Sequence, residues 1–182
     1  MTQSALKIGF IGLGIMGAPM AGHLLKAGHT MFIHTIGKPP AELADGGATA
    51  CATSRAVTER ADIIFIMVPD TPDVQEVLFS EYGVASGLAK GKTVVDCSSI
   101  DPIATRRFAE QIAALGCDYL DAPVSGGEVG AKAASLTIMV GGQPQAFERI
   151  RPLFELMGKN ITLVGPPGDG QVCKVATRSS WR

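Results

Sequence analysis

The chain has 182 residues, of which 46% are hydrophobic, and this is enough to build one hydrophobic core. Its 16 basic and 17 acidic residues give a formal net charge of −1, which excludes the broad positive field that binds nucleic acids or anionic membranes. The four cysteines have no metal-binding spacing, and no apolar run reaches the roughly 20 residues that span a bilayer. We therefore expect a cytoplasmic protein with reduced thiols and with no metal, nucleic-acid or membrane partner.

Short apolar runs alternate with longer helical patterns along the chain. The apolar runs predict strands at residues 7–11, 31–34, 63–68, 93–96, 119–120, 137–140 and 161–164. Patterns of 3.6-residue period predict helices at residues 16–27, 72–79, 102–115 and 145–157. Most of the strands are apolar at consecutive positions, as in parallel sheets that are buried on both faces. The sequence thus predicts an α/β fold, a Rossmann-like doubly wound and mostly parallel sheet with helices on both faces.

Prolines and glycines mark several ends of these elements. Asp101 and Pro102 form a good N-cap and first-turn pair. Pro152 is expected to kink or divide the helix at residues 145–157. Residues 165–170 are rich in glycine and proline and break the pattern, which predicts a boundary near residue 165 and a new element from Gln171 onward.

The first predicted strand runs directly into a glycine-rich loop that opens a helix. The loop consists of Gly12, Leu13, Gly14, Ile15, Met16 and Gly17. In such loops the first glycine permits a tight turn, the second lets the backbone approach a pyrophosphate, and the third lets the helix pack closely on the strand. The helix N-terminus then offers free N–H groups to the phosphates. The loop predicts a dinucleotide site, and a plain turn that needs glycine only for its backbone is the alternative.

The end of the second strand bears on the choice of cofactor. Thr35 stands where NAD-binding domains usually carry an acidic residue for the ribose hydroxyls, and Lys38 follows three residues later. Without a carboxylate, this strand end does not repel a 2′-phosphate, and Lys38 can pair with one. We expect NADP or NAD as cofactor, with NADP favoured. An ordinary solvated lysine in a loop is the alternative for Lys38.

Five motifs follow one another along residues 6–176. They are FIGLGIMGAPMA (residues 10–21), MVP (67–69), DCSS (96–99), DAPVSGG (121–127) and GQVCK (170–174). With these motifs the chain resembles the β-hydroxyacid dehydrogenases, a family that includes 3-hydroxyisobutyrate dehydrogenases and tartronate semialdehyde reductases. The resemblance implies hydride transfer between a nicotinamide cofactor and a small hydroxy or aldehyde acid. Within this family, the residues of the motifs are more similar to those of the tartronate semialdehyde reductases, which reduce 2-hydroxy-3-oxopropionate to glycerate.

The resemblance also implies roles for individual residues. It assigns the substrate carboxylate to Ser125, Gly126 and Gly127, where successive backbone N–H groups can form an anion nest. It assigns the catalytic proton transfer to Lys174. Without the resemblance, the first segment is equally a plain loop before a helix, and a lone lysine on a helix is ordinarily solvated. Further residues that the resemblance places at the cofactor are Met67, Val68 and Pro69, together with Ser98 and Ser99.

The last residues depart from the family pattern. The family continues past the lysine into a long helix with an asparagine and an all-helical second domain, whereas this chain has TRSSWR at residues 177–182. One set of codons for these residues, ACC AGA TCA TCG TGG CGC, becomes AAC CAG ATC ATC GTG GCG when an A is restored, and this encodes Asn-Gln-Ile-Ile-Val-Ala. We therefore expect a frameshifted tail at residues 177–182, with a short protein and a divergent tail as the alternative.

The expected organisation follows from these observations. An NAD(P)-binding Rossmann-like domain at residues 1–165 is followed at residues 166–182 by the start of a truncated interdomain helix, with the C-terminal all-helical domain missing. The expected function is an oxidoreductase of small hydroxy or aldehyde acids, weakly active or inactive in this form, and the resemblance implies homo-oligomers for full-length relatives. The alternatives are a 3-hydroxyisobutyrate dehydrogenase and a non-catalytic nucleotide-binding module.

Overall fold

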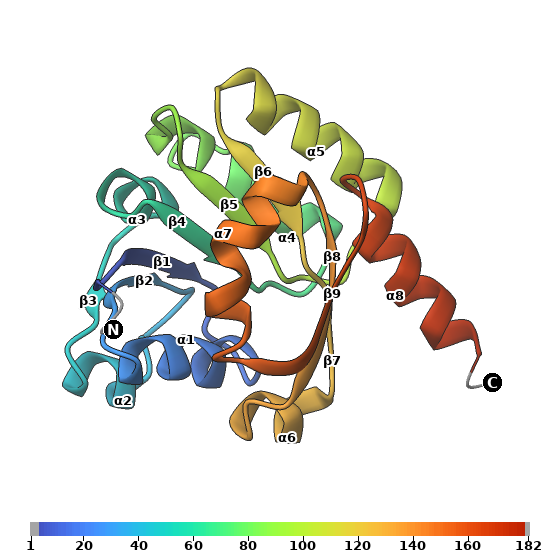
Figure 1. The fold of residues 1–182 in the computed structure, drawn as a ribbon. Helices are drawn as coiled ribbons and strands as arrows, with labels where there is room; N and C mark the ends of the chain where they lie inside the picture. The colour runs from blue at the N-terminus through green and yellow to red at the C-terminus, as the bar shows by residue number, and fades with distance from the viewer. Residues whose placement is uncertain (1–3, 181–182) are drawn as a thin grey trace.

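The computed structural model describes residues 4–180, which form one sheet with helices on both faces (Figure 1). The strands are β1 (Lys7–Ile11), β2 (Thr30–His34), β3 (Thr49–Ala50), β4 (Ile63–Ile66), β5 (Thr93–Asp96), β6 (Asp118–Asp121), β7 (Val124–Ser125), β8 (Leu136–Gly141) and β9 (Gly158–Gly165). The helices are α1 (Gly17–Lys26), α2 (Ala41–Asp45), α3 (Ser54–Arg60), α4 (Thr71–Phe79), α5 (Pro102–Ala114), α6 (Gly127–Lys132), α7 (Pro144–Phe154) and α8 (Asp169–Ser179), with a 3₁₀ turn, η1, at Ala85–Gly87.

The strand order is that of a doubly wound sheet. It runs β3-β2-β1-β4-β5-β6-β8-β7, with β9 also paired to β8. The pairs from β3 to β6 are parallel, as is β8 with β9, whereas β8 is antiparallel to β6 and β7. This confirms the predicted mostly parallel sheet. The chain leaves β1 in one direction to β2 and later returns on its other side at β4, so the carboxyl ends of β1 and β4 form the switch point at which such sheets bind ligands.

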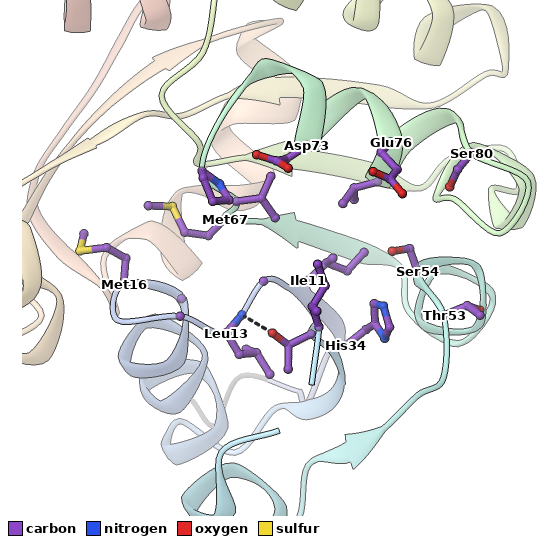
Figure 2. A pocket seen from close by; sticks show the side chains of 18 of the residues that line it. Ile11, Leu13, Met16, His34, Thr53, Ser54, Met67, Asp73, Glu76 and Ser80 are labelled. Atoms are coloured by element: carbon purple, nitrogen blue, oxygen red, sulfur yellow. Dashed lines mark hydrogen bonds between the residues drawn. The ribbon is translucent and has the colours of Figure 1, made fainter. Parts of the chain in front are cut away.

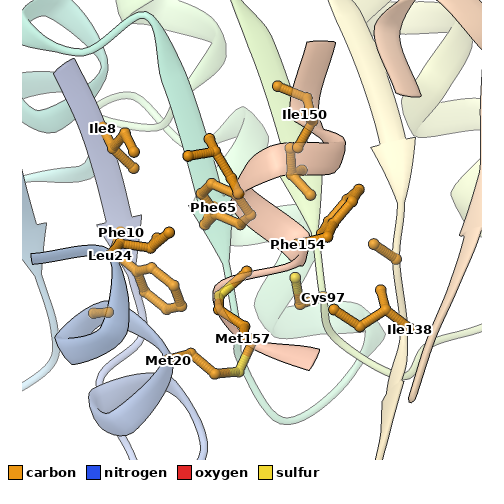
Figure 3. Close-up of a cluster of buried hydrophobic side chains, with 14 of the residues drawn as sticks. Ile8, Phe10, Met20, Leu24, Phe65, Cys97, Ile138, Ile150, Phe154 and Met157 are labelled. Carbon is orange, nitrogen blue, oxygen red and sulfur yellow. The ribbon is translucent and has the colours of Figure 1, made fainter. Parts of the chain in front are cut away.

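Two hydrophobic clusters, one on each face, hold the helices to the sheet. The first lies under α1, α2, α6 and α7, where Phe65 stacks on Phe10 with ring centroids 5.8 Å apart and meets Phe154 edge-on at 6.3 Å (Figure 3). The second lies under α3, α4 and α5 and contains Leu78 and Phe108. Because the strands are buried on both faces, their consecutive apolar residues each reach one of the two clusters.

The structure differs from the predicted elements in two respects. Of the two outcomes expected at Pro152, a kink or a division of the helix, the division does not occur, because helix α7 continues through Pro152 to Phe154. Pro152 lies in the last turn, where its missing N–H removes only one late hydrogen bond. In addition, α2, β3, α3, β7 and α6 have no predicted counterpart. These elements have two to seven residues, too few for a hydrophobic period to show in the sequence.

Helix α8 is the new helix expected after residue 165. It begins against β8 and α5 and then runs outward from the sheet, with the C-terminus at its far end (Figure 1). Residues 177–179 of the predicted frameshifted tail continue this helix, whereas Trp181 and Arg182 lie outside the described residues. The frameshift and the domain boundary at residue 165 both stay predictions.

Within residues 4–180, no helix combines the length and apolar character needed to cross a bilayer.

Candidate functional site

A cavity of about 630 Å³ opens at the carboxyl ends of β1 and β4, at the switch point of the sheet. The glycine loop, the end of β2, the segment after β4 and helix α4 surround it (Figure 2). The structure brings ten residues of the predicted cofactor site to its lining: Gly12, Leu13, Gly14, Ile15, Met16, Gly17, Thr35, Met67, Val68 and Pro69. Segments that are more than 50 residues apart in the sequence thus meet around one space.

The three glycines of the loop have different surroundings. Gly12 has a φ of +93°, and a Cβ atom there would collide with the carbonyl oxygen of Met67. A Cβ at Gly17 would collide with the carbonyl oxygen of Gly12. By contrast, a Cβ at Gly14 would have no neighbouring atom within 4 Å. The fold itself therefore requires glycine at the first and third positions, whereas the space above Gly14 is open to a ligand.

The loop and the start of α1 can hold an anion. Helix α1 has no side-chain cap at Met16, so its first N–H groups face the loop with the positive end of the helix dipole behind them. Thr35, just after β2, is hydrogen-bonded to the loop: its Oγ1 accepts a hydrogen bond of 3.3 Å from the N–H of Leu13 (Figure 2). These groups fit a pyrophosphate, because the donors are backbone N–H groups at a helix N-terminus that has no side-chain cap.

Sequence reasoning did not find the polar residues on the far wall of the cavity. Asp73 and Glu76 point into it from α4 (Figure 2), and His34, Thr53 and Tyr82 also line it. The two acidic residues stand three apart on a helix that directly follows a strand, and this spacing is the signal that could have revealed them. Lys38, the predicted partner of a 2′-phosphate, is exposed but is not among the residues that line the cavity.

The two serines after β5 have different positions. Ser99 lines the cavity, whereas Ser98 is fully buried behind the wall. The hydroxyl oxygen of Ser98 accepts a hydrogen bond of 3.0 Å from the N–H of Val68. Of the pair, the residue that faces the cavity is therefore Ser99, and Ser98 supports the wall from behind.

The segment assigned to the substrate carboxylate forms an exposed turn outside the cavity lining. Ser125 ends β7, and Gly127 begins α6. Gly126 and Gly127 have φ values of +135° and +62°, a backbone that other residues rarely adopt.

Lys174 lies on α8, also outside the residues that line the cavity. It is partly buried, and desolvation, followed by the nearby positive charge of Arg178, lowers its pKa below that of an ordinary lysine.

Two buried carboxyl groups stand at the ends of β5 and β6. Asp96 accepts hydrogen bonds from the N–H of Ser98 at 3.0 Å and from the hydroxyl of Tyr119 at 2.9 Å. Asp121 accepts them from the N–H groups of Gly168 and Gln171 at 2.8 and 2.9 Å. Burial raises the pKa of each carboxyl group from 3.8 to about 6, since it outweighs the hydrogen bonds that favour the charged form.

Within residues 4–180, no cluster of three metal-ligating side chains occurs, and all four cysteines are free.

The glycine loop, the open space at Gly14 and the position at the switch point define a Rossmann-like dinucleotide-binding domain. Comparison with known proteins identifies its family. The chain belongs to the family described as the NAD binding domain of 6-phosphogluconate dehydrogenase, whose sequence profile matches residues 7–165.

The relatives confirm the resemblance that the motifs gave. The chain is 62% identical over 173 residues to the 2-hydroxy-3-oxopropionate reductase of Escherichia coli K12, and this covers 95% of the chain and 59% of the relative. A structure of Mycobacterium tuberculosis 3-hydroxyisobutyrate dehydrogenase with L-serine matches with a TM-score of 0.91 at 31% identity, covering 98% of the chain and 60% of that protein. An imine reductase from Myxococcus stipitatus in complex with NADP+ matches with a TM-score of 0.87 at 26% identity, covering 96% and 61%. The chain spans about three-fifths of the length of each.

Proposed function

We propose that this chain is the cofactor-binding part of a reductase that converts 2-hydroxy-3-oxopropionate to glycerate. The observation that carries the proposal is the open space over Gly14, at the start of an uncapped helix and beside a 630 Å³ cavity. That arrangement suits a dinucleotide, and the 62% identity to a 2-hydroxy-3-oxopropionate reductase supports the substrate. When bound, the nicotinamide cofactor would supply the hydride that reaches the carbonyl carbon.

In this proposal the chain's own residues bind the acid and move a proton. Ser125 and the backbone N–H groups of Gly126 and Gly127 hold the substrate carboxylate, because a turn with positive φ angles can direct successive N–H groups to one anion. Lys174 donates a proton to the carbonyl oxygen. The lowered pKa of Lys174 supports this role, since a general acid works best when its pKa lies nearer the working pH.

A reductase assay tests the substrate and the carboxylate site together. The chain, and a fusion of it to the remaining part of the Escherichia coli relative, are assayed with 2-hydroxy-3-oxopropionate and, in the reverse direction, with 3-hydroxyisobutyrate. We expect higher kcat/KM for the first substrate in the fusion. Ser125→Ala should raise KM about tenfold with little change in kcat, as for the loss of a hydrogen bond to a charged group. Ser4→Ala, at an exposed serine outside the site, is the matched control.

The alternatives give different results in the same assay. A higher kcat/KM for 3-hydroxyisobutyrate would make the protein a 3-hydroxyisobutyrate dehydrogenase. A fusion that binds the cofactor but turns over neither acid would support a non-catalytic nucleotide-binding module. A normal KM in Ser125→Ala would remove Ser125 from the substrate site.

We further propose that NADP is the preferred cofactor. Support comes from the end of β2, where Thr35 replaces the usual carboxylate and its hydroxyl is engaged by the glycine loop, and from the exposed Lys38 nearby. Lys38→Ala should raise the Kd of NADPH about fivefold, as for a surface ion pair of about 1 kcal/mol, and leave that of NADH unchanged. Titration calorimetry measures both, with Lys159→Ala as a control at an exposed lysine of β9. Equal effects on the two cofactors would contradict this assignment.

A further inference from the structure

Gln171 is an unusual residue for its position. It belongs to the first turn of α8, where most residues from Val172 onward are at least partly exposed, yet only 1% of its own surface is accessible. Burial of an amide side chain costs free energy unless its donors and acceptors are paired. In residues 4–180, no buried side-chain nitrogen or oxygen lacks a hydrogen-bond partner. The amide of Gln171 is therefore buried with its hydrogen bonds made.

Three hydrogen bonds tie Gln171 to two strand ends. Its Nε2 donates to the carbonyl oxygen of Ser98 at 2.7 Å, and its Oε1 accepts from the N–H of Ile100 at 3.1 Å. Its backbone N–H donates to a carboxyl oxygen of Asp121 at 2.9 Å. The other oxygen of this carboxyl group accepts from the N–H of Gly168, the residue before α8. Gln171 and Asp121 together fix where α8 starts and how it is rotated about its axis.

The side-chain bonds of Gln171 end on the loop that supports the cavity. Ser99, between the two partners of the amide, lines the cavity, and the hydroxyl of Ser98 accepts from the N–H of Val68 in the opposite wall segment. A continuous path of hydrogen bonds therefore leads from the cavity wall through Ser98 to Gln171 and α8. An apolar side chain of the same size would fill the space but would leave the Ser98 carbonyl and the Ile100 N–H unpaired.

The position of Gln171 on its helix relates it to Lys174. Residues three apart on an α-helix lie on the same side, about 4.5 Å apart along the axis. Fixing the rotation and height of Gln171 therefore fixes those of Lys174 one turn later. Among residues 4–180, the ammonium group of Lys174 has no hydrogen-bond partner in the sheet domain, so the position of the lysine depends on the anchoring of the helix that carries it.

We propose that Gln171 is the positioning residue of Lys174, holding α8 to the Ser98–Ile100 loop so that the lysine keeps a fixed place relative to the cofactor cavity. This inference rests on the proposed function, in which Lys174 donates the proton. It assigns to Gln171 no contact with substrate or cofactor.

The test compares Gln171→Met, which keeps the volume and removes both amide hydrogen bonds, with the parent chain. In the chain itself, hydrogen exchange reports the anchoring of α8, and NMR of ¹³C-methylated lysines reports the pKa of Lys174. We expect faster exchange in the first turns of α8 and a Lys174 pKa that rises toward the ordinary lysine value as the helix loosens. The Kd of the cofactor should stay within twofold. Gln145→Met, at an exposed glutamine of α7, is the matched control and should change neither.

Turnover in the fusion with the Escherichia coli relative provides the second readout. Gln171→Met should lower kcat about tenfold with KM within twofold, and should cost nothing further in a Lys174→Ala background, because the residue acts only through the lysine. A loss of kcat that multiplies with that of Lys174→Ala would indicate a general structural role and overturn the proposal. An unchanged kcat with an unchanged Lys174 pKa would also overturn it.

Gln171→Glu keeps the proposal testable if Gln171→Met does not fold. A protonated glutamic acid can restore both hydrogen bonds, whereas the ionised form cannot donate to Ser98, so the ratio of variant to parent kcat should rise as the pH falls from 8 to 6. Asp96 and Asp121 also titrate in this range, so the pH profile of the parent is measured alongside that of the variant. A ratio that is reduced but independent of pH would overturn the proposal. If Lys174→Ala alone retains near-normal turnover, the proton-donor role proposed for Lys174 fails instead, whatever the Gln171 variants do.

Discussion

Replacing Gly14 with valine should raise the Kd of the nicotinamide dinucleotide at least about tenfold and leave the thermal stability of the unliganded chain unchanged. The reason lies in the surroundings of the three loop glycines. A Cβ at Gly14 meets no atom of the protein within 4 Å, so the side chain fits the unliganded protein but occupies the space through which the pyrophosphate approaches the backbone. Titration calorimetry measures the Kd, and thermal denaturation measures stability.

The other two glycines are the internal controls for this result. Gly12→Ala and Gly17→Ala should each lower stability, by roughly 1–3 kcal/mol or more, because the added Cβ meets a backbone carbonyl that cannot easily move. Substitutions at Gly12 and Gly17 should thus lower the stability of the fold, whereas the substitution at Gly14 should lower only the affinity for the cofactor. If Gly14→Val bound the cofactor as tightly as the parent, the loop would not be the pyrophosphate site.

Loss of the Lys174 side chain has the second large expected effect. Lys174→Ala should lower kcat about a hundredfold or more in the fusion with the Escherichia coli relative, because a general acid contributes roughly 10²–10⁴ to the rate. Cofactor binding should change less than twofold, since Lys174 is not among the residues that line the cavity. Initial rates and calorimetry measure the two quantities.

Two further variants sharpen the lysine experiment. Lys174→Arg keeps the positive charge but is too weak an acid to replace the lysine, so it should remain nearly as slow as Lys174→Ala. Lys132→Ala removes an exposed lysine that pairs with Glu128 and should leave the rate unchanged. Near-normal turnover in Lys174→Ala would require another proton donor.

Features that depend on local sequence could be predicted, and those that depend on tertiary packing could not. The glycine loop could be predicted because the tight turn, the approach of a phosphate and the close packing of the helix each require a glycine at a fixed position between the strand and the helix. The main strands were found because burial on both faces makes them apolar throughout. The short helices α2 and α6 were missed because five or six residues show no clear hydrophobic period.

The candidate site shows the same division. Ser98 and Ser99 are indistinguishable in the sequence, and only the packing of the β5 end decides that Ser99 faces the cavity. Gln171 gave no signal of its own, because its partners at Ser98 and Ile100 lie more than 70 residues earlier in the chain. The cytoplasmic location, the homo-oligomeric state of full-length relatives and the frameshifted tail stay predictions.

The buried carboxyl groups of Asp96 and Asp121 have a consequence for the response of the whole protein to acid. Each has a pKa of about 6 in the folded chain, above the ordinary value of 3.8, so between these values the unfolded chain releases a proton that the folded chain keeps. Stability that is present below pH 3.8 is therefore lost as the pH rises to about 6, by up to about 3 kcal/mol for each group. In urea unfolding, these two groups should oppose the usual gain in stability between pH 4 and 6. Mild acidification therefore costs this domain less stability than it would if Asp96 and Asp121 were held ionised.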